Sequence, residues 1–289
     1  LKYYINEGGG YNDITPIRAT TTNGIVFAAT NGFSTITATD DAHGAVVNDF
    51  VTLSGAATLG GVITAGVLNQ EYQVLSVPDA NTFTFAARVA GTSIGSITTT
   101  YGLNPTPVVA NASDTGNGGS GADAAYQTTV GLDTALTGNG WNAGSFGRGT
   151  WNSSSNLSVD GATLRIWSHD NFGEDLILNA RDAGIFYWDR TNDTTTRAVA
   201  LSSLLNSNLA PTIAKKVLVS DRDRHIIAFG CDPETAIGTQ DPLLIRFGSQ
   251  ESLTDWQSLA TNTAGELRIG SGSEIITAIE TRQQVLVFT

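Results

Sequence analysis

The sequence predicts an all-β protein, a partial β-propeller platform with an inserted small β-barrel or sandwich domain. Three observations lead to this prediction. The chain of 289 residues has 32 glycines and only 15% charged residues, a composition that favours short strands and frequent turns over long helices. Short apolar segments alternate with polar turns along most of the chain, as strands do. Towards the C-terminus these segments recur as a repeat, which is typical of propeller blades.

Residues 1–19 are expected to form an N-terminal strand or arm joined to the propeller. Three consecutive glycines, at positions 8–10, precede Ile14-Thr15-Pro16-Ile17. A glycine run of this kind favours a tight turn between extended segments. The simplest interpretation is a strand at the surface.

Residues 20–101 are predicted to be the inserted small β-domain. Their apolar segments are short and are separated by Gly, Asn and Asp, a spacing typical of a small barrel or sandwich. The clearest segments are Ile25-Val26-Phe27, Ser34-Thr35-Ile36-Thr37, Phe50-Val51-Thr52-Leu53, Tyr72-Gln73-Val74-Leu75 and Thr82-Phe83-Thr84-Phe85.

Residues 102–160 are interpreted as a loop region rich in glycine and aromatic residues. Trp141, Phe146 and Trp151 are separated by Gly and Asn. The rings in such a loop usually fix it to a neighbouring surface, and stacking on a glycan is the alternative. We therefore take Trp141 and Trp151 as candidate assembly or surface contacts.

Residues 161–289 are predicted to form three propeller-type blades, the last of them truncated. Leu176, Ile226 and Ile276 occupy equivalent places in three successive groups of apolar segments. A propeller closes with about four to eight blades, so more chain is expected beyond Thr289. The lack of any methionine and the apolar C-terminal segment also indicate a piece of a longer polypeptide. An open sandwich is the alternative, although an even spacing is not expected of one.

Two polar clusters lie in turns of this repeat. His169, Asp170, Glu174 and Asp175 are close in sequence, but a glycosidase needs two carboxylates that face each other across a sugar, so a structural turn is the favoured interpretation. The segment Asp221-Arg222-Asp223-Arg224 alternates in charge. Its four residues are candidate assembly or surface contacts, as parts of an ion-pair network.

No catalytic residue, cofactor-binding motif or metal site is predicted, and the chain is not expected to be an enzyme. Cys231 is the single cysteine, and His43 and His225 stand alone, without metal-ligand spacing. The segment Asp114–Gly119 lacks the regular carboxylates of a calcium loop. No apolar run approaches the roughly 20 residues of a membrane-spanning helix.

The net charge of −12 argues against a protein that wraps around the outside of DNA, where Lys and Arg must neutralise phosphates. An acidic surface is compatible with a channel through which DNA slides without binding. The charge therefore excludes one class of DNA contact and leaves the other open.

Four segments together resemble a family of phage virion structural proteins related to the tail nozzle and DNA-stabilisation (head-to-tail closure) proteins of short-tailed bacteriophages. They are residues 3–18, 167–176, 220–225 and 247–256. The resemblance implies a ring, expected to be hexameric, in the phage tail of the virion. It also implies contacts with adaptor, portal and fibre proteins, and retention and release of genomic DNA that passes without specific binding.

The alternative function is a receptor- or glycan-binding module, either a tail fibre head or a lectin-like β-propeller that uses Trp141 and Trp151. Fibre heads are usually trimeric, so the symmetry of the assembly distinguishes the two functions.

Overall fold

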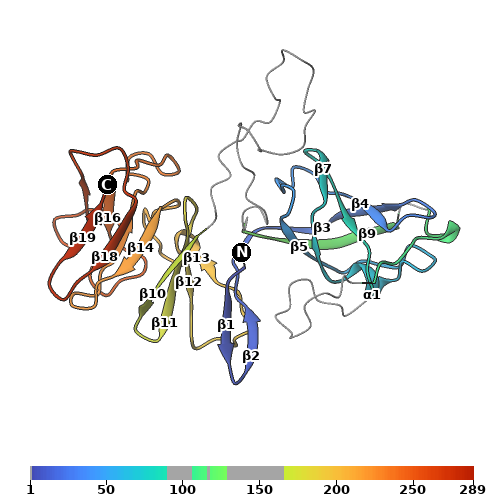
Figure 1. The fold of residues 1–289 in the computed structure, drawn as a ribbon, viewed down its shortest axis with the longest axis horizontal. Helices are drawn as coiled ribbons and strands as arrows, with labels where there is room; N and C mark the ends of the chain where they lie inside the picture. Colours follow the sequence, from blue (N-terminus) through green and yellow to red (C-terminus); the bar gives the residue numbers. More distant parts are fainter. Residues whose placement is uncertain (1, 90–105, 116–117, 129–165) are drawn as a thin grey trace, which may run out of the picture. The chain divides into compact units, whose positions relative to one another are not determined.

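The computed structural model describes residues 2–89, 106–115, 118–128 and 166–289 (Figure 1). The all-β prediction is confirmed, since 42% of the residues that the structure describes are in strands and 4% are in helices. Contacts divide the chain into two compact units. Arg18–Arg165 form one, here called the insert unit, while Lys2–Ile17 and Ile166–Thr289 form the other, the repeat unit.

The insert unit is built on a seven-stranded sheet in the order β6-β5-β9-β3-β4-β8-β7, and its described pairings do not close a barrel. A short helix α1, Ala65–Leu68, and a 3-10 turn, Ala112–Asp114, lie in its loops. The strands are β3 Ile17–Ala29, β4 Thr35–Thr39, β5 Phe50–Ser54, β6 Glu71–Gln73, β7 Ser76–Asp79, β8 Thr82–Ala86 and β9 Gly118–Gln127.

Alternating side chains build the core of the insert unit. Ile36 and Ala38 in β4 are fully buried, as are Phe83 and Phe85 in β8, while their strand neighbours are more exposed. This is the period of two that a strand imposes on its side chains. The centroids of the Tyr72 and Phe85 rings lie 4.2 Å apart, so aromatic side chains pack against each other within this core.

Strand β9 corrects the prediction for part of residues 102–160. The glycine-rich segment that the sequence suggested to be a loop is a strand from residue 118 and pairs with β5. Its buried side chains are mainly small, Ala122 and Ala124 with Tyr126. The inward and outward positions of the strand therefore differ little in hydrophobicity. Trp141 and Trp151 lie outside the described residues.

The repeat unit contains four antiparallel sheets whose strands pair in chain order. Two are hairpins, β1 Tyr4–Glu7 with β2 Gly10–Asp13 and β18 Thr277–Glu280 with β19 Val285–Phe288. The first four-stranded sheet has β10 Trp167–Phe172, β11 Asp175–Ala180, β12 Ile185–Trp188 and β13 Val199–Ala200, followed by the 3-10 turn Leu201–Ser203. The second has β14 Lys216–Val219, β15 Ile226–Phe229, β16 Leu244–Phe247 and β17 Gly265–Arg268.

The N-terminal hairpin is fixed to the first four-stranded sheet. Gly8 and Gly9 have φ angles of +62° and +88°, the backbone that a tight hairpin turn needs and that glycine adopts without strain. The Tyr3 ring lies 5.5 Å from that of Trp167, and Ala198 N donates to Ile14 O at 3.1 Å. Residues 2–17 therefore belong to the repeat unit despite the long segment that separates them from it in sequence.

The predicted repeat is wrong in its third member. Leu176 and Ile226 lie in second strands, β11 and β15, but Ile276 precedes β18, the first strand of its hairpin. Leu267-Arg268-Ile269, the apolar segment that precedes Ile276 in the predicted third repeat, instead overlaps β17, the fourth strand of the second sheet. First strands begin at residues 167, 216 and 277, so the spacing is uneven. The sequence pattern shows apolar segments but not which ones pair.

Each pair of successive sheets in the repeat unit shares its own apolar core. One core lies between the N-terminal hairpin and the first four-stranded sheet, a second between the two four-stranded sheets, and a third between the second sheet and β18–β19. Their buried members include Ile14, Leu178, Phe186 and Trp188; then Ile177, Ile185, Val217, Val219, Ile226 and Trp256; then Phe229, Leu243, Ile275 and Ala278.

Candidate functional site

Of the candidate contact residues predicted from the sequence, the structure describes those of the charged turn Asp221–Arg224, which connects β14 and β15. All four residues are exposed. Ser220 O accepts a hydrogen bond from Arg224 N at 2.8 Å, and Arg224 has a φ of +52°. The turn is therefore a closed loop at the end of the hairpin, with its four side chains accessible.

The side chains of this turn make loose contacts. Arg222 Nε lies 3.8 Å from Asp223 Oδ1, and Arg224 Nε lies 3.6 Å from Glu251 Oε1. Pairs between exposed charges contribute only about 0–1 kcal/mol. The ion-pair network expected from the sequence is thus present in part, and it leaves these charges available to a partner.

The backbone of the turn reaches the C-terminal hairpin, and one of its arginines reaches the first four-stranded sheet. Asp221 N donates to the Glu280 carboxylate at 3.1 and 3.3 Å. The Arg224 guanidinium lies 5.4 Å from the centroid of the Phe172 ring. The charged turn therefore contacts both sheets that neighbour its own.

A hollow of about 250 Å³ opens beside the charged turn. It lies between the β14–β15 turn and the turn of the β18–β19 hairpin. Its lining combines apolar side chains with charged and amide groups: Ser220, Arg222, Asp223, His225, Ile227, Phe247, Glu280, Thr281, Arg282, Gln283, Gln284 and Val285. No sequence pattern indicated this hollow, because the two turns that form it are far apart in the chain.

Side chains connect the first strands of successive sheets. Val217 N donates to Ser168 Oγ at 3.3 Å and Val219 N to Asp170 Oδ2 at 2.9 Å, which joins β14 to β10. Lys216 Nζ donates to Thr277 Oγ1 at 3.2 Å, which joins β14 to β18. Burial lowers the pKa of Lys216, although the charge of Asp170 acts in the opposite direction.

Two of the three carboxylates of the segment 169–175, those of Asp170 and Asp175, are engaged in structural contacts, whereas Glu174 is exposed. Besides the bond from Val219 to Asp170, Asp175 Oδ2 accepts from Tyr187 Oη at 2.7 Å and Oδ1 from Arg190 N at 3.0 Å. Burial raises the pKa of the Tyr187 hydroxyl, and the bond to Asp175 raises it further. The His169 ring meets that of Tyr3 edge-on at 5.7 Å. These contacts fit the structural interpretation of the cluster.

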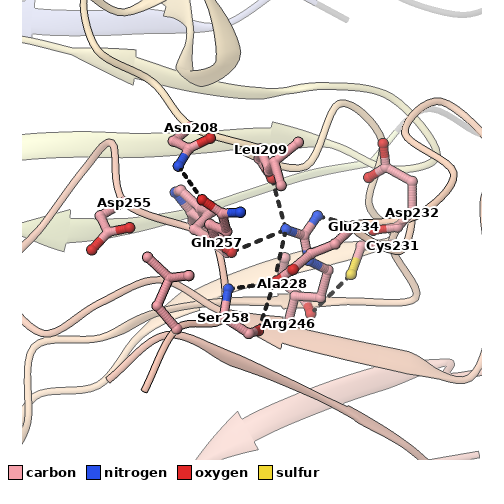
Figure 2. A network of polar contacts seen from close by, with 12 residues as sticks. Asn208, Leu209, Ala228, Cys231, Asp232, Glu234, Arg246, Asp255, Gln257 and Ser258 are labelled. Atoms are coloured by element: carbon pink, nitrogen blue, oxygen red, sulfur yellow. Dashed lines mark hydrogen bonds and ion pairs between the residues drawn. The ribbon is translucent and has the colours of Figure 1, made fainter. Parts of the chain in front are cut away.

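A buried arginine joins the loops of the second four-stranded sheet, and no sequence signal identified it. Arg246 in β16 is fully buried, and Figure 2 shows its guanidinium among the loop backbones. It donates to Leu209 O at 2.7 Å, Asp232 O at 3.1 Å and Trp256 O at 3.2 Å. Its Nη2 also lies 3.8 Å from Glu234 Oε1. The cation therefore holds three loop segments together.

Cys231 lies beside this arginine network and is fully buried. Burial raises the pKa of its thiol to about 12. The thiolate is the nucleophilic form of cysteine, so a thiol that stays protonated at neutral pH is a structural group.

Buried carboxylates in the insert unit are also engaged. Asp114 accepts from the backbone N–H groups of Gly61, Val62, Ile63 and Asn111 at 2.8–3.1 Å. Burial raises its pKa, but these four donors outweigh burial and the net pKa is lowered. The Asp114 carboxylate is therefore used as an acceptor for the backbone of the neighbouring loop.

His43 lies in the core of the insert unit. Its Nδ1 accepts from Ala45 N at 2.9 Å, and its ring packs against those of Phe83 and Tyr126, which also contact each other. Within the described ranges, no group of three or more His, Cys, Asp or Glu residues could hold a metal ion. No helix in the described part of the chain is long and apolar enough to cross a membrane.

Comparison with known proteins gives a remote likeness to a solved phage structure. No family model matches the sequence, and no curated protein matches it. Among solved structures, the phage phi92 endosialidase aligns at 14% identity over 93% of this chain and 34% of that chain, with a TM-score of 0.22. This chain thus spans about a third of the length of that structure. A likeness this low transfers no fold, site or activity.

Proposed function

We propose that the chain is a structural component of a bacteriophage tail, a nozzle or head-to-tail connector that forms a ring around the DNA exit channel. In this role it retains the genome and then releases it. The observation that carries the proposal is the stack of sheets in the repeat unit, each pair of which shares a core.

Alternating residues show that the four-stranded sheets are buried on both faces. Ile177 packs in the core with the second sheet, whereas Leu178, next in the strand, packs in the core with the N-terminal hairpin. Ala228 and Phe229 are divided in the same way between the second and third cores. Antiparallel sheets stacked face to face, each with strands in chain order, are the arrangement of propeller blades. We infer a partial propeller platform.

The outer face of the C-terminal hairpin continues this pattern. Ile276, Ile279, Leu286 and Phe288 are each about half exposed, at 47%, 51%, 47% and 48%. In the other sheets of the unit, apolar side chains on a sheet face are buried against a neighbouring sheet. The apolar side chains on this face of the hairpin are of the same kind. In the proposed platform a further sheet covers this face.

The segments that resemble phage tail proteins all belong to the repeat unit. Residues 3–18 form the N-terminal hairpin and its continuation, 167–176 form β10 with the start of β11, and 220–225 form the charged turn. Residues 247–256 lead to Trp256, which is fully buried. These segments make contacts between sheets, which supports a mechanical platform rather than an active site.

A structural role also agrees with the use of the polar side chains. Asp170, Asp175 and Asp114 each accept hydrogen bonds from backbone groups, and the thiol of Cys231 is buried. We therefore propose that the protein is not an enzyme. The charged turn Asp221–Arg224 is exposed and is proposed as a contact with neighbouring copies or other tail proteins.

Antibody labelling tests this location. Antibodies raised against the purified chain would be applied to particles of the phage that encodes it and viewed by negative-stain electron microscopy. The proposal predicts label at the tail axis near the head–tail junction. Label at fibre tips, or on no part of the particle, would contradict it.

A further inference from the structure

We propose that the hollow between the β14–β15 and β18–β19 turns is a binding site for one carboxylated sugar residue, of the uronic acid class. This property does not depend on a position in a phage tail. Three features of the hollow fit such a ligand: an apolar floor, two arginines on the rim and further polar groups.

The floor of the hollow is apolar. Ile227, Phe247 and Val285 line it. Ile227 and Val285 pack against the core between the second sheet and the C-terminal hairpin, and the Phe247 ring meets that of His225 edge-on at 5.9 Å. Gly265 lies opposite Phe247 in the sheet, and a Cβ there would be 2.7 Å from the Phe247 ring. The glycine lets this ring lie close against β17. An aromatic ring with aliphatic neighbours suits the C–H face of a sugar.

Two arginines on the rim have guanidinium groups that are exposed and make few contacts. Arg222 is 77% exposed and has only the 3.8 Å contact with Asp223. Arg282 is exposed and forms no ion pair with the residues that the structure describes. A guanidinium binds a carboxylate through two parallel hydrogen bonds. The lining also carries the carboxylates of Asp223 and Glu280, and Glu280 already accepts from Asp221 N, so the unused guanidinium donors of the two arginines are the groups that would bind a ligand carboxylate.

The remaining polar groups suit hydroxyls. The Glu280 carboxylate already accepts from Asp221 N, and His225 Nδ1 donates to Gly248 O at 2.7 Å. Asp223, Gln283 and Gln284 also line the hollow and offer acceptors and donors for the hydroxyl groups of a sugar. The hollow of about 250 Å³ lies just below the size of drug-sized ligand pockets, roughly 300 Å³ and above, which favours a single ring.

Calorimetric titration of the full chain with D-glucuronic acid, D-glucose and sodium acetate tests the site. We expect glucuronic acid to bind with a Kd of about 1 mM, an affinity typical of few contacts, and glucose and acetate to bind at least roughly tenfold more weakly. The double variant Arg222→Gln with Arg282→Gln should lose roughly tenfold or more in affinity. Arg190→Gln, an exposed arginine of the same unit outside the hollow, should bind as the unchanged chain does.

Three results would overturn the proposal. Glucuronic acid that does not bind at tens of millimolar shows that there is no such site. Acetate that binds equally well shows a carboxylate contact without a sugar site. Unchanged affinity in the double variant, with its circular dichroism spectrum unchanged, shows that the sugar binds elsewhere.

Discussion

At the scale of single residues, Arg246 has the strongest structural role. Its guanidinium supplies hydrogen bonds to three loop carbonyls in a fully buried place. Arg246→Met would leave these carbonyls without donors and Glu234 without its cation. Removing one partner of a buried charged network costs about 3–5 kcal/mol. We expect a loss of that order in the free energy of unfolding, measured with urea and tryptophan fluorescence.

Arg268 provides the matched control for Arg246. It lies on the adjacent strand β17, where its Nε is 2.6 Å from Asp241 Oδ2, but its side chain is 57% exposed. Arg268→Met should therefore cost less than about 1 kcal/mol. Equal losses in the two variants would show that the buried network does not stabilise the unit.

Asp114 gives the insert unit a pH-dependent contribution to stability. Its folded pKa is lowered, while an unfolded aspartate has a pKa of about 4. The contribution is therefore fully present above about pH 4 and is lost as the pH falls through the lowered folded pKa. Asp114→Asn should lower the protection of the Gly61, Val62 and Ile63 amides by about 1–3 kcal/mol at pH 7, measured by hydrogen exchange corrected for intrinsic rates.

The difference between the unchanged chain and Asp114→Asn should narrow at pH values below the folded pKa, because the carboxyl is then protonated in both states of the unchanged chain. Asp41→Asn, at an exposed position of the same unit, should show no difference at any pH. A gap that stays constant with pH would mean that the charge of Asp114 plays no part.

Residue roles were predictable only where the chemistry is local. The alternating charges at 221–224 mark an exposed turn, and the turn is exposed. Arg246 in Leu244-Ile245-Arg246-Phe247 looks like an ordinary outward position of a strand, because its three acceptors come from loops remote in sequence. Asp114 was hidden in the same way, since three of its four donors lie in residues 61–63.

At the scale of elements, the hydrogen bond from Val219 N to Asp170 joins two successive sheets, and removing it tests how much it contributes to holding them together. Asp170→Ala removes the acceptor at 2.9 Å and leaves a buried amide unpaired, a loss of about 1–3 kcal/mol. Hydrogen exchange in residues 216–219 should become faster by the corresponding factor. Asp170→Asn, which keeps one carbonyl oxygen as acceptor, should restore part of the protection.

The control for Asp170 is the next residue of the same strand. Asn171 is exposed, and neighbouring side chains in a strand point to opposite faces, so Asn171→Ala should leave exchange in 216–219 unchanged. Equal protection in Asp170→Ala and the unchanged chain would show that apolar packing alone joins β10 to β14.

Elements were predictable where apolar side chains alternate strongly. The segments of β4, β5 and β8 were all foreseen, and Leu176 and Ile226 of the predicted repeat lie in β11 and β15. Strand β9 was missed because its inward side chains are mostly alanines, and β17 was assigned to the wrong repeat because Gly265-Glu266-Leu267-Arg268 is more exposed than buried. Which strands pair depends on contacts between residues far apart in the chain, and the spacing of apolar segments does not show these contacts.

At the scale of the whole molecule, the net charge of −12 predicts a protein that does not hold DNA. We expect no binding to duplex DNA tighter than about 10⁻⁴ M at low salt, measured by fluorescence anisotropy. Binding that weakens steeply as salt rises would reveal phosphate contacts by Lys and Arg and would contradict a channel through which DNA slides.

The central claim is that this chain is part of a ring at the tail axis. Cryo-electron microscopy of particles of the phage that encodes it tests this claim most directly. The account predicts a ring of copies, expected to be hexameric, around the DNA channel, with the sheets of the repeat unit stacked in each copy. A trimeric fibre head away from the axis, or particles without the chain, would contradict the account.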